Sequence, residues 1–263
     1  MYPRVIRFSL FAATLLTLAG CGTLKEQDET AQWSAEKIYN TSEEAAKDGN
    51  YNRANQLLER LEAKYPYGRY AQAALLRQAY NYSKTQEPAL AIAALDRFIR
   101  LYPNHAAIDY AYYLKGVIHF DSGATFLNTW SDNDRSERDP KTAREAFDIF
   151  KQLVARFPDS KYAEDARSRM QFLVNSLSTY EVSVARYYMR RGAYLAVVGR
   201  AQQALKDYPK TPANEEALAL LVKAYEALGV QESRQNYLQI LERTFPTSRF
   251  LKDIDSHKSW WGS

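Results

Sequence analysis

An aromatic residue followed by proline occurs five times in this chain, each time after a stretch with helical spacing of apolar residues. The five pairs are Tyr65-Pro66, Tyr102-Pro103, Phe157-Pro158, Tyr208-Pro209 and Phe245-Pro246, and their prolines are 37, 55, 51 and 37 residues apart. Proline has no backbone N–H and pushes the residue before it into extended conformations, so each helix is predicted to end there. A period near 34 residues is typical of tetratricopeptide helix pairs.

The second helix of each predicted pair repeats one pattern of apolar positions, three or four residues apart, on one helix face. In the first three pairs these positions are Ala54, Leu57, Leu58 and Leu61, then Ala91, Ala94, Leu95 and Phe98, then Ala146, Ile149, Phe150 and Leu153. The pattern is broken in the last two pairs, where Arg200 takes the place of Leu57 and Arg234 that of Ala54. We expect less regular packing in the last pair.

The chain is therefore predicted to be all-α, a tetratricopeptide-repeat superhelix of about five helix pairs over residues 33–250. First helices are expected over residues 33–47, 70–83, 106–120, 160–189 and 213–228, which gives N-terminal repeats over 33–140 and C-terminal repeats over 141–250. A tail over 251–263 remains, and we expect its adjacent tryptophans, Trp260 and Trp261, to cap the last repeat. Stacked pairs of this kind leave a concave surface that typically binds other polypeptides.

The two longer intervals between prolines differ in kind. Residues 161–190 contain no glycine or proline, which predicts one helix of roughly 45 Å. Residues 121–140 are instead rich in charge, and we expect a loop, which is usually functional or disordered at this length. The sequence leaves both a partner-contact loop and a solvated excursion open. The contact candidates are Trp130, Arg135 and Arg138.

The N-terminus has the features of a secretory signal peptide over residues 1–20. Arg4 and Arg7 precede an apolar run that is too short to cross a bilayer as a helix. Leu-Ala-Gly then precedes Cys21, the single cysteine of the chain. This arrangement is similar to a bacterial lipoprotein processing site, so we expect Cys21 to be lipidated, with an unmodified cysteine in a secreted protein as the alternative. The same resemblance implies the outer membrane, because retention in the inner membrane favours aspartate at the position of Gly22. Residues 21–32 are predicted to form a flexible tether.

Charge and motif content exclude several functions. Removing residues 1–20 takes away two arginines, which leaves 33 basic against 31 acidic residues and a net charge of +2, too little to indicate nucleic-acid binding. A catalytic site needs a nucleophile, a base or a metal with converging partners. His105, His119 and His257 lie on separate predicted elements without metal-ligand spacing. We therefore expect no enzyme activity, no metal and no cofactor.

Tyrosine is abundant, with twenty residues, and several occur in clusters. The clusters are Tyr80 and Tyr82, then Tyr110, Tyr112 and Tyr113, then Tyr187 and Tyr188. Most should belong to the repeat core. Some should line the concave surface, because tyrosine offers stiff apolar area together with a hydroxyl group.

Several segments together match one family of envelope lipoproteins. They are the motif at Cys21, the five repeats, Tyr65-Pro66-Tyr67-Gly68-Arg69-Tyr70, the run from Asp134 to Pro140, and Tyr187-Tyr188 followed by Arg191-Gly192-Ala193-Tyr194-Leu195-Ala196-Val197-Val198. The chain resembles, over essentially its whole length, the BamD family (also called ComL or YfiO) of the outer-membrane β-barrel assembly (BAM) machinery. Repeats alone would be weak evidence, but their order, insertions and lipid signal are specific in combination.

The resemblance implies a non-enzymatic lipoprotein subunit of the BAM complex, held by its lipid on the periplasmic face of the outer membrane. It implies contact with the POTRA domain of BamA through the C-terminal repeats, with other BAM lipoproteins, and with unfolded outer-membrane β-barrel proteins through the N-terminal repeats. The corresponding residues here are Tyr188, Arg191, Tyr194 and Arg200 on the BamA side, and Tyr65, Tyr67, Arg69 and Tyr70 on the substrate side.

For two of these candidate residues, a simpler structural role is also open. Arg200 is easiest to explain if it reaches a partner, but an arginine lying beside its small neighbours Ala201 and Ala204 is the alternative. Tyr65 also occupies the aromatic position that precedes proline in every repeat, which favours a core role. For the whole chain, the alternatives are a lipoprotein scaffold that organises peptidoglycan-related envelope proteins, an envelope enzyme with a site between repeats, and a DNA-uptake factor.

Overall fold

The computed structural model describes residues 28–128 and 140–256, and within these residues the protein has eleven α-helices and no β-strand. The helices are α2 (Ala35–Lys47), α3 (Tyr51–Lys64), α4 (Arg69–Lys84), α5 (Pro88–Leu101), α6 (Ile108–Asn128), α7 (Lys141–Arg156), α8 (Ala163–Arg190), α9 (Tyr194–Asp207), α10 (Asn214–Ala227), α11 (Gln231–Thr244) and α12 (Arg249–Asp255). The all-α prediction is confirmed.

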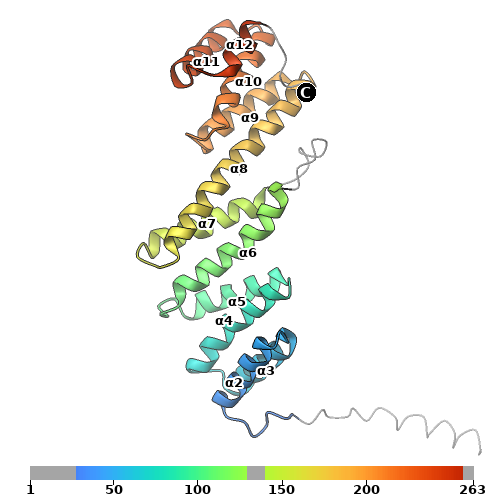
Figure 1. The fold of residues 1–263 in the computed structure, drawn as a ribbon, viewed down its shortest axis with the longest axis vertical. Coiled ribbons are helices and arrows are strands. Elements are labelled where there is room, and N and C mark those ends of the chain that lie inside the picture. Colours follow the sequence, from blue (N-terminus) through green and yellow to red (C-terminus); the bar gives the residue numbers. More distant parts are fainter. Residues whose placement is uncertain (1–27, 129–139, 257–263) are drawn as a thin grey trace, which may run out of the picture.

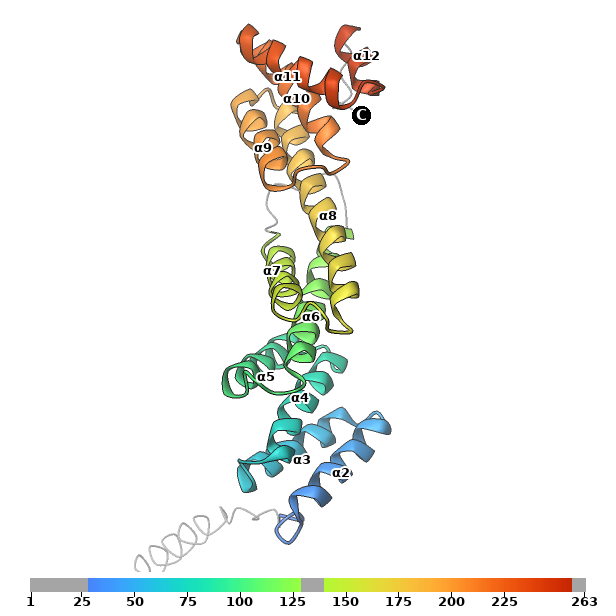
Figure 2. The same cartoon turned by 90° about the vertical axis from the view of Figure 1, so that its left-hand side faces the viewer.

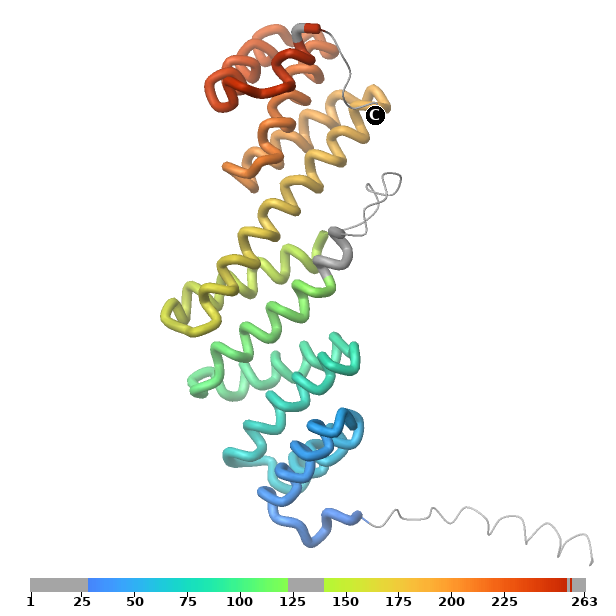
Figure 3. The backbone as a smooth tube through the Cα atoms, viewed as in Figure 1, coloured from blue at the N-terminus to red at the C-terminus, as the bar shows by residue number. Residues whose placement is uncertain are grey.

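The helices form five pairs that stack one after another along the long axis of the molecule (Figures 1 and 3). The first helices are α2, α4, α6, α8 and α10, and each second helix runs back along the first and packs against it. The pair α2 and α3 lies at one end, and α10, α11 and α12 lie at the other. The predicted tetratricopeptide superhelix is therefore confirmed.

Each aromatic residue before a proline is the C-terminal cap of a second helix. Tyr65, Tyr102, Phe157, Tyr208 and Phe245 follow α3, α5, α7, α9 and α11 with φ between −128° and −133°. Each backbone N–H still donates to the carbonyl four residues earlier, at 2.7 to 3.1 Å. The proline that follows has no N–H with which to continue the helix. All five rings are half-buried against apolar clusters, so the same residue ends the helix and packs the repeat.

The repeated apolar positions form the core, as the sequence predicts. Fully buried members are Ala54, Leu57, Leu58, Leu61, Ala91, Leu95, Phe98, Ala146, Phe150, Leu153, Val197, Ala201 and Ala204. Fewer positions are buried in the last pair, where Leu241 alone is buried among the residues described in α11. Arg234, which replaces a small residue there, lies 3.8 Å from Glu226 at the edge of the pair.

One close contact between α6 and α7 depends on glycine. A Cβ atom added at Gly116 would lie 2.5, 2.7 and 2.9 Å from three ring carbons of Phe150. Phe150 is fully buried, so its ring cannot turn out of the way without opening the core. The absence of a side chain at Gly116 therefore sets the spacing of these two helices.

Helix α6 is longer than expected. The sequence predicts an end near residue 120 and a loop over 121–140, but the helix continues to Asn128. No proline lies between Phe120 and Asn128, so nothing in the backbone forces an earlier end. The first eight residues of the insertion are therefore helical, which corrects the loop prediction for that part. Residues 129–139 lie outside the described residues.

Helix α8 joins the two halves of the protein. It has 28 residues, which corresponds to about 42 Å and matches the predicted long helix. Its N-terminal part packs against α6 and α7, and its C-terminal part packs against α9 and α10 (Figure 2). Residues 180–185 are all buried, because this part of α8 is surrounded by neighbouring helices.

The fold extends past both predicted boundaries. Phe250 and Ile254 of α12 are buried against α10, so the segment from 251 to 255 is part of the last repeat rather than of a tail. Trp260 and Trp261 lie outside the described residues. At the other end Thr30 is buried and residues 28–32 form turns against α3, so this part of the predicted tether belongs to the fold. Among the described residues, no helix has the length and apolar character needed to cross a membrane.

Candidate protein-binding surfaces

Three of the four residues predicted for the BamA side meet at the turn between α8 and α9. Tyr188 lies in the last turn of α8, Arg191 caps that helix and Tyr194 begins α9. Both tyrosines are half-buried against the core of the C-terminal repeats, whereas Arg191 is exposed. The guanidinium of Arg191 lies 4.6 Å from the ring centroid of Tyr187. The turn therefore presents the Arg191 guanidinium packed on the Tyr187 ring, close in the chain to Tyr188 and Tyr194, which pack on the core.

Leu195 adds an apolar side chain to this turn. It is the second residue of α9 and is 75% exposed, whereas Val197 in the same turn of the helix is fully buried. The apolar period of α9 marks the buried positions, and Leu195 lies off that stripe, which is the signal that could have found it. Tyr187, Arg191 and Leu195 are called the α8–α9 patch below.

Arg200, the fourth predicted residue, has a partner within the chain. Its Nη1 donates to Glu181 Oε2 at 2.9 Å, and Arg144 Nη2 donates to Glu181 Oε1 at 3.1 Å. Glu181 is fully buried, while the side chains of Arg144 and Arg200 are 40% and 38% exposed. Charged groups inside proteins are almost always paired in this way. The break in the repeat pattern at Arg200 therefore has an explanation inside the molecule, and its partner role stays a prediction.

The residues predicted for the substrate side surround the turn between α3 and α4. Tyr67 is 89% exposed, and Arg69 donates from Nη2 to the hydroxyl of Tyr70 at 2.9 Å. Tyr65 is half-buried, and its hydroxyl donates to the carbonyl of Trp33 at 2.9 Å. Tyr67 and Arg69 are thus at the surface. Tyr65 has the packed position that its core alternative requires.

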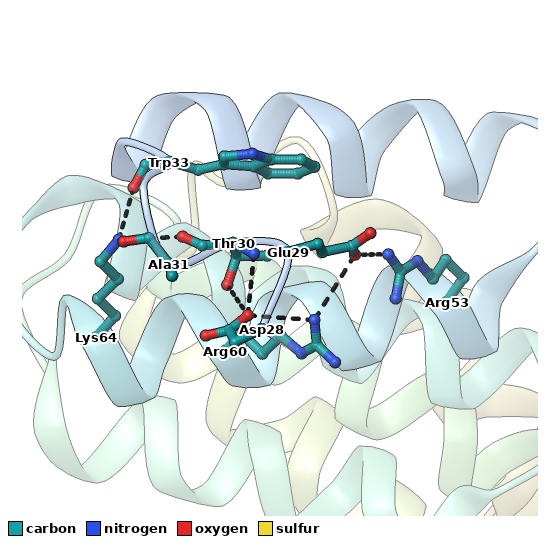
Figure 4. A network of polar contacts seen from close by, with 8 residues as sticks. All are labelled: Asp28, Glu29, Thr30, Ala31, Trp33, Arg53, Arg60 and Lys64. Carbon is teal, nitrogen blue, oxygen red and sulfur yellow. Dashed lines mark hydrogen bonds and ion pairs between the residues drawn. The ribbon is translucent and has the colours of Figure 1, made fainter. Parts of the chain in front are cut away.

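Residues 28–33, called the N-terminal strap, lie along α3 beside this turn (Figure 4). Lys64 at the end of α3 donates from Nζ to the carbonyl oxygens of Thr30, Ala31 and Trp33, at 3.1, 2.7 and 3.0 Å. A single ammonium group therefore closes the strap, with one donor for each carbonyl.

The acidic residues of the strap meet the basic residues of α3. Asp28 Oδ1 lies 3.3 Å from Arg60 Nη1, and Glu29 pairs with Arg53 (Figure 4). Asp28 also accepts hydrogen bonds from Thr30, and the side-chain bond is the main reason that the pKa of Asp28 is lowered. Composition alone predicts that these residues belong to a flexible tether. Their binding depends on α3 residues up to 32 positions away, which a local pattern does not contain.

We expect Lys64→Met to release the strap. The three carbonyls would lose a charged donor, and hydrogen bonds to charged groups contribute about 1.5–3 kcal/mol each. Amide hydrogen exchange of residues 28–33 should rise roughly tenfold or more, while exchange in α4 stays unchanged. Lys47→Met is the matched control, because Lys47 is also the exposed last residue of a helix. Equal exchange in both variants would mean that Lys64 does not hold the strap.

A cavity of about 630 Å³ lies between α4 and α6 in the N-terminal repeats. Its lining includes Tyr80, Tyr110 and Tyr113, with the aliphatic residues Leu114, Val117 and Ile118 and the charged residues Lys84 and Asp121. Tyr112, in contrast, is buried in the core. The tyrosine clusters divide as the sequence predicts, with some members in the core and others at an open surface.

Tyr113 extends this aromatic surface onto α8. Its ring stacks on Tyr162 with centroids 4.6 Å apart, and its hydroxyl donates to Asp165 Oδ2 at 2.9 Å. Arg169 Nε donates to the same oxygen at 2.6 Å. Burial acts to raise the pKa of Asp165, but the hydrogen bonds from Arg169 and Tyr113 outweigh it and lower the pKa below its ordinary value. The carboxylate therefore remains ionised and fixes the tyrosine.

The remaining candidate residues predicted from the sequence are not described by the structure. Cys21, Trp130, Arg135 and Arg138 lie outside the described residues and stay predictions. Within residues 28–128 and 140–256, no group of three or more His, Cys, Asp or Glu side chains is arranged to hold a metal ion.

The two histidines in this part of the chain are packed apart from one another. His105 Nδ1 accepts from the backbone N–H of Ala107 at 3.0 Å. His119 lies beside Glu145, and burial lowers its pKa.

Stacked helix pairs of this kind define a tetratricopeptide-type helical-repeat protein. Residues 31–241 match the family model YfiO, described as outer membrane lipoprotein. The chain belongs to this family, whose curated members carry the name BamD.

The relatives cover nearly the whole chain. The chain is 44% identical over 252 residues to the outer membrane protein assembly factor BamD of Neisseria meningitidis serogroup B, with 94% of each chain covered. It is 35% identical to that of Xylella fastidiosa (93% and 83% covered) and 34% identical to that of Vibrio cholerae (87% and 94% covered). Similar solved structures include the MamA protein, with a TM-score of 0.38, 16% identity and coverage of 80% and 90%. The family resemblance predicted from the sequence is confirmed.

Proposed function

We propose that this chain is a non-enzymatic scaffold subunit of the outer-membrane β-barrel assembly complex. It binds the periplasmic POTRA region of BamA through the C-terminal repeats and receives unfolded outer-membrane β-barrel proteins through the N-terminal repeats. Family membership supports the assignment to the complex, because the relatives are named outer membrane protein assembly factors.

The α8–α9 patch is the observation that carries the BamA side. Leu195 is 75% exposed on a rigid helix, beside the stacked Arg191 and Tyr187. Tyrosine and arginine are enriched among the residues that dominate interface energies. Covering a leucine side chain stabilises a complex by roughly 1.5–3 kcal/mol. The patch thus has the composition of an interface centre, within the segment that resembles the family's contact region.

The substrate side is supported by two neighbouring features of the N-terminal repeats. Tyr67 and Arg69 are exposed at the α3–α4 turn, and the cavity lined by Tyr80, Tyr110 and Tyr113 lies in the next repeats. A pocket of a few hundred Å³ accommodates one or two large side chains. Unfolded barrel proteins expose such apolar side chains before they fold, so the cavity has a shape and chemistry that suit them.

The proposed anchor places the strap end of the protein near the membrane. Lipidation of Cys21 would leave seven residues before Asp28, the first described residue, and seven residues reach at most about 25 Å. The insertion residues Trp130, Arg135 and Arg138 remain the candidates for contact with other lipoprotein subunits.

Affinity purification of the lipidated protein from detergent-solubilised envelopes tests the proposal. We expect a POTRA-bearing barrel protein to co-purify, and depletion of this protein to reduce folded outer-membrane barrel proteins. Recovery of peptidoglycan enzymes instead, with barrel proteins unchanged, would favour the alternative scaffold function.

Leu195→Glu should reduce recovery of the POTRA-bearing partner by about tenfold or more, because it places a charge in a desolvated contact. The fold should be unaffected, since an acid in the first turn of a helix interacts favourably with the helix dipole. Leu90→Glu is the matched control, because Leu90 is also an exposed leucine in the first turn of a second helix, 47% exposed. Equal loss of the partner from both variants, or from neither, would contradict a role of the α8–α9 patch.

A further inference from the structure

A fully buried carboxylate lies at the junction of the two halves of the protein. Glu181 is in the middle of α8 and is 0% exposed, among residues 180–185 that are all buried. Replacing buried ion pairs by apolar residues is often neutral or stabilising, so stability by itself is a weak reason for a glutamate here. Another function of this side chain therefore has to be considered.

The two arginines that bind Glu181 come from helices in different halves of the protein. Arg144 extends from α7 in one half, and Arg200 extends from α9 in the other, and each binds a different oxygen of the carboxylate. Figure 2 shows α7 and α9 on the two sides of the junction that α8 crosses. Glu181 is fully buried, so release of Arg200 would leave one carboxylate oxygen without its donor, at a cost in free energy. The Arg200 guanidinium is thereby held in one orientation with part of its surface exposed.

We infer that Glu181 is a positioning residue for partner binding: it presents Arg200 to an acidic group of the POTRA partner, while Arg144 fixes the other carboxylate oxygen. This inference rests on the proposed function. A free arginine has large rotamer freedom, which it loses on binding at a cost of roughly 1–2 kcal/mol. An arginine that is already held loses less, so a fixed guanidinium binds a carboxylate more tightly than a mobile one.

Three possible accounts of Glu181 predict different effects of removing its charge on the affinity for the partner. Glu181 is negative, so through-space electrostatics alone predicts that Glu181→Gln strengthens binding of an acidic partner. Positioning predicts weaker binding, because Arg200 loses the charge that holds it. A purely structural role predicts unchanged affinity while the protein remains folded. The sign of the change therefore identifies the role.

The test is titration of the detergent-solubilised, lipidated protein with the purified POTRA region of BamA. We expect Glu181→Gln to raise the dissociation constant about tenfold, with the salt dependence of binding reduced because a charge contact is lost. Glu43→Gln is the matched control: Glu43 is also paired with an arginine, Arg77, but lies in the N-terminal repeats. The control should bind like the wild type.

Glu181→Asp is the second variant, in case Glu181→Gln fails to fold. It keeps the charge but shortens the side chain by one methylene, so one carboxylate can no longer reach both arginines. Weaker binding by this variant with normal helical content supports positioning, whereas unchanged or tighter binding by either variant overturns it. If the wild-type protein does not bind the POTRA region, the proposed function itself fails. If Arg200→Gln binds normally, only the role of this site fails.

Discussion

Arg200→Glu should lower the free energy of unfolding by about 3 kcal/mol. Breaking a buried ion pair costs roughly 3–5 kcal/mol because it leaves a buried charge uncompensated. Here Arg144 still pairs with Glu181, which reduces the loss, but the new carboxylate repels the buried one. Urea unfolding followed by far-UV circular dichroism measures the change, and hydrogen exchange in α9 shows where it occurs.

The double variant Glu181→Gln with Arg200→Glu provides the control. It removes the buried charge, so the glutamate at position 200 no longer faces a buried carboxylate. At least half of the lost stability should return, since neighbouring charges are strongly non-additive. Two results would contradict this expectation: additive losses in the double variant, or an Arg200→Glu variant within about 0.5 kcal/mol of the wild type. Either would mean that the Arg200–Glu181 pair behaves like an exposed ion pair, which contributes little to stability.

This stability effect changes how binding assays of Arg200 are interpreted. A charge reversal at Arg200 would weaken partner binding directly and would also disturb α8 and α9. Leu195→Glu avoids this problem, because Leu195 is mostly exposed and lies in the first turn of its helix. The two variants together separate a lost contact from a lost fold.

The repeat pattern could be predicted from the sequence because its causes are local. An aromatic residue before proline ends a helix wherever it occurs, and apolar residues three or four apart face one side of a helix. Leu57 and Phe98 are buried for that reason alone. The family resemblance depended on motifs of the same local kind.

The remaining features depend on contacts between distant residues. Glu181 lies 19 positions from Arg200 and 37 from Arg144, so the sequence around Arg200 shows a polar break without its partner. The strap is bound by an α3 lysine that composition cannot connect to it. Helix α6 runs past residue 120 because no backbone signal stops it, and charge content alone was a wrong guide to a loop there.

Gly116→Val should lower the free energy of unfolding by about 3 kcal/mol, at the upper end of the range for overpacked cores. The Cβ position is already 2.5 Å from the nearest ring carbon of Phe150, and valine adds two further methyl groups. Urea unfolding measures the change. Gly199→Val is the matched control, because a Cβ atom at Gly199 in α9 meets nothing within 4 Å apart from its chain neighbours and the nearby backbone of its own helix. That variant should stay within about 0.5 kcal/mol of the wild type.

Removing the ring tests whether the Gly116 contact is the cause. Phe150→Ala alone should cost about 3–5 kcal/mol, but it also makes room for the valine. The double variant should therefore be more stable than the sum of the two losses predicts, by more than about 1 kcal/mol. Strict additivity would show that the α6–α7 spacing does not depend on this contact. If the spacing does depend on it, Gly116 also fixes how Tyr113 on α6, at the substrate-side cavity, lies relative to Arg144 on α7, because both side chains are carried by the two helices that meet at this glycine.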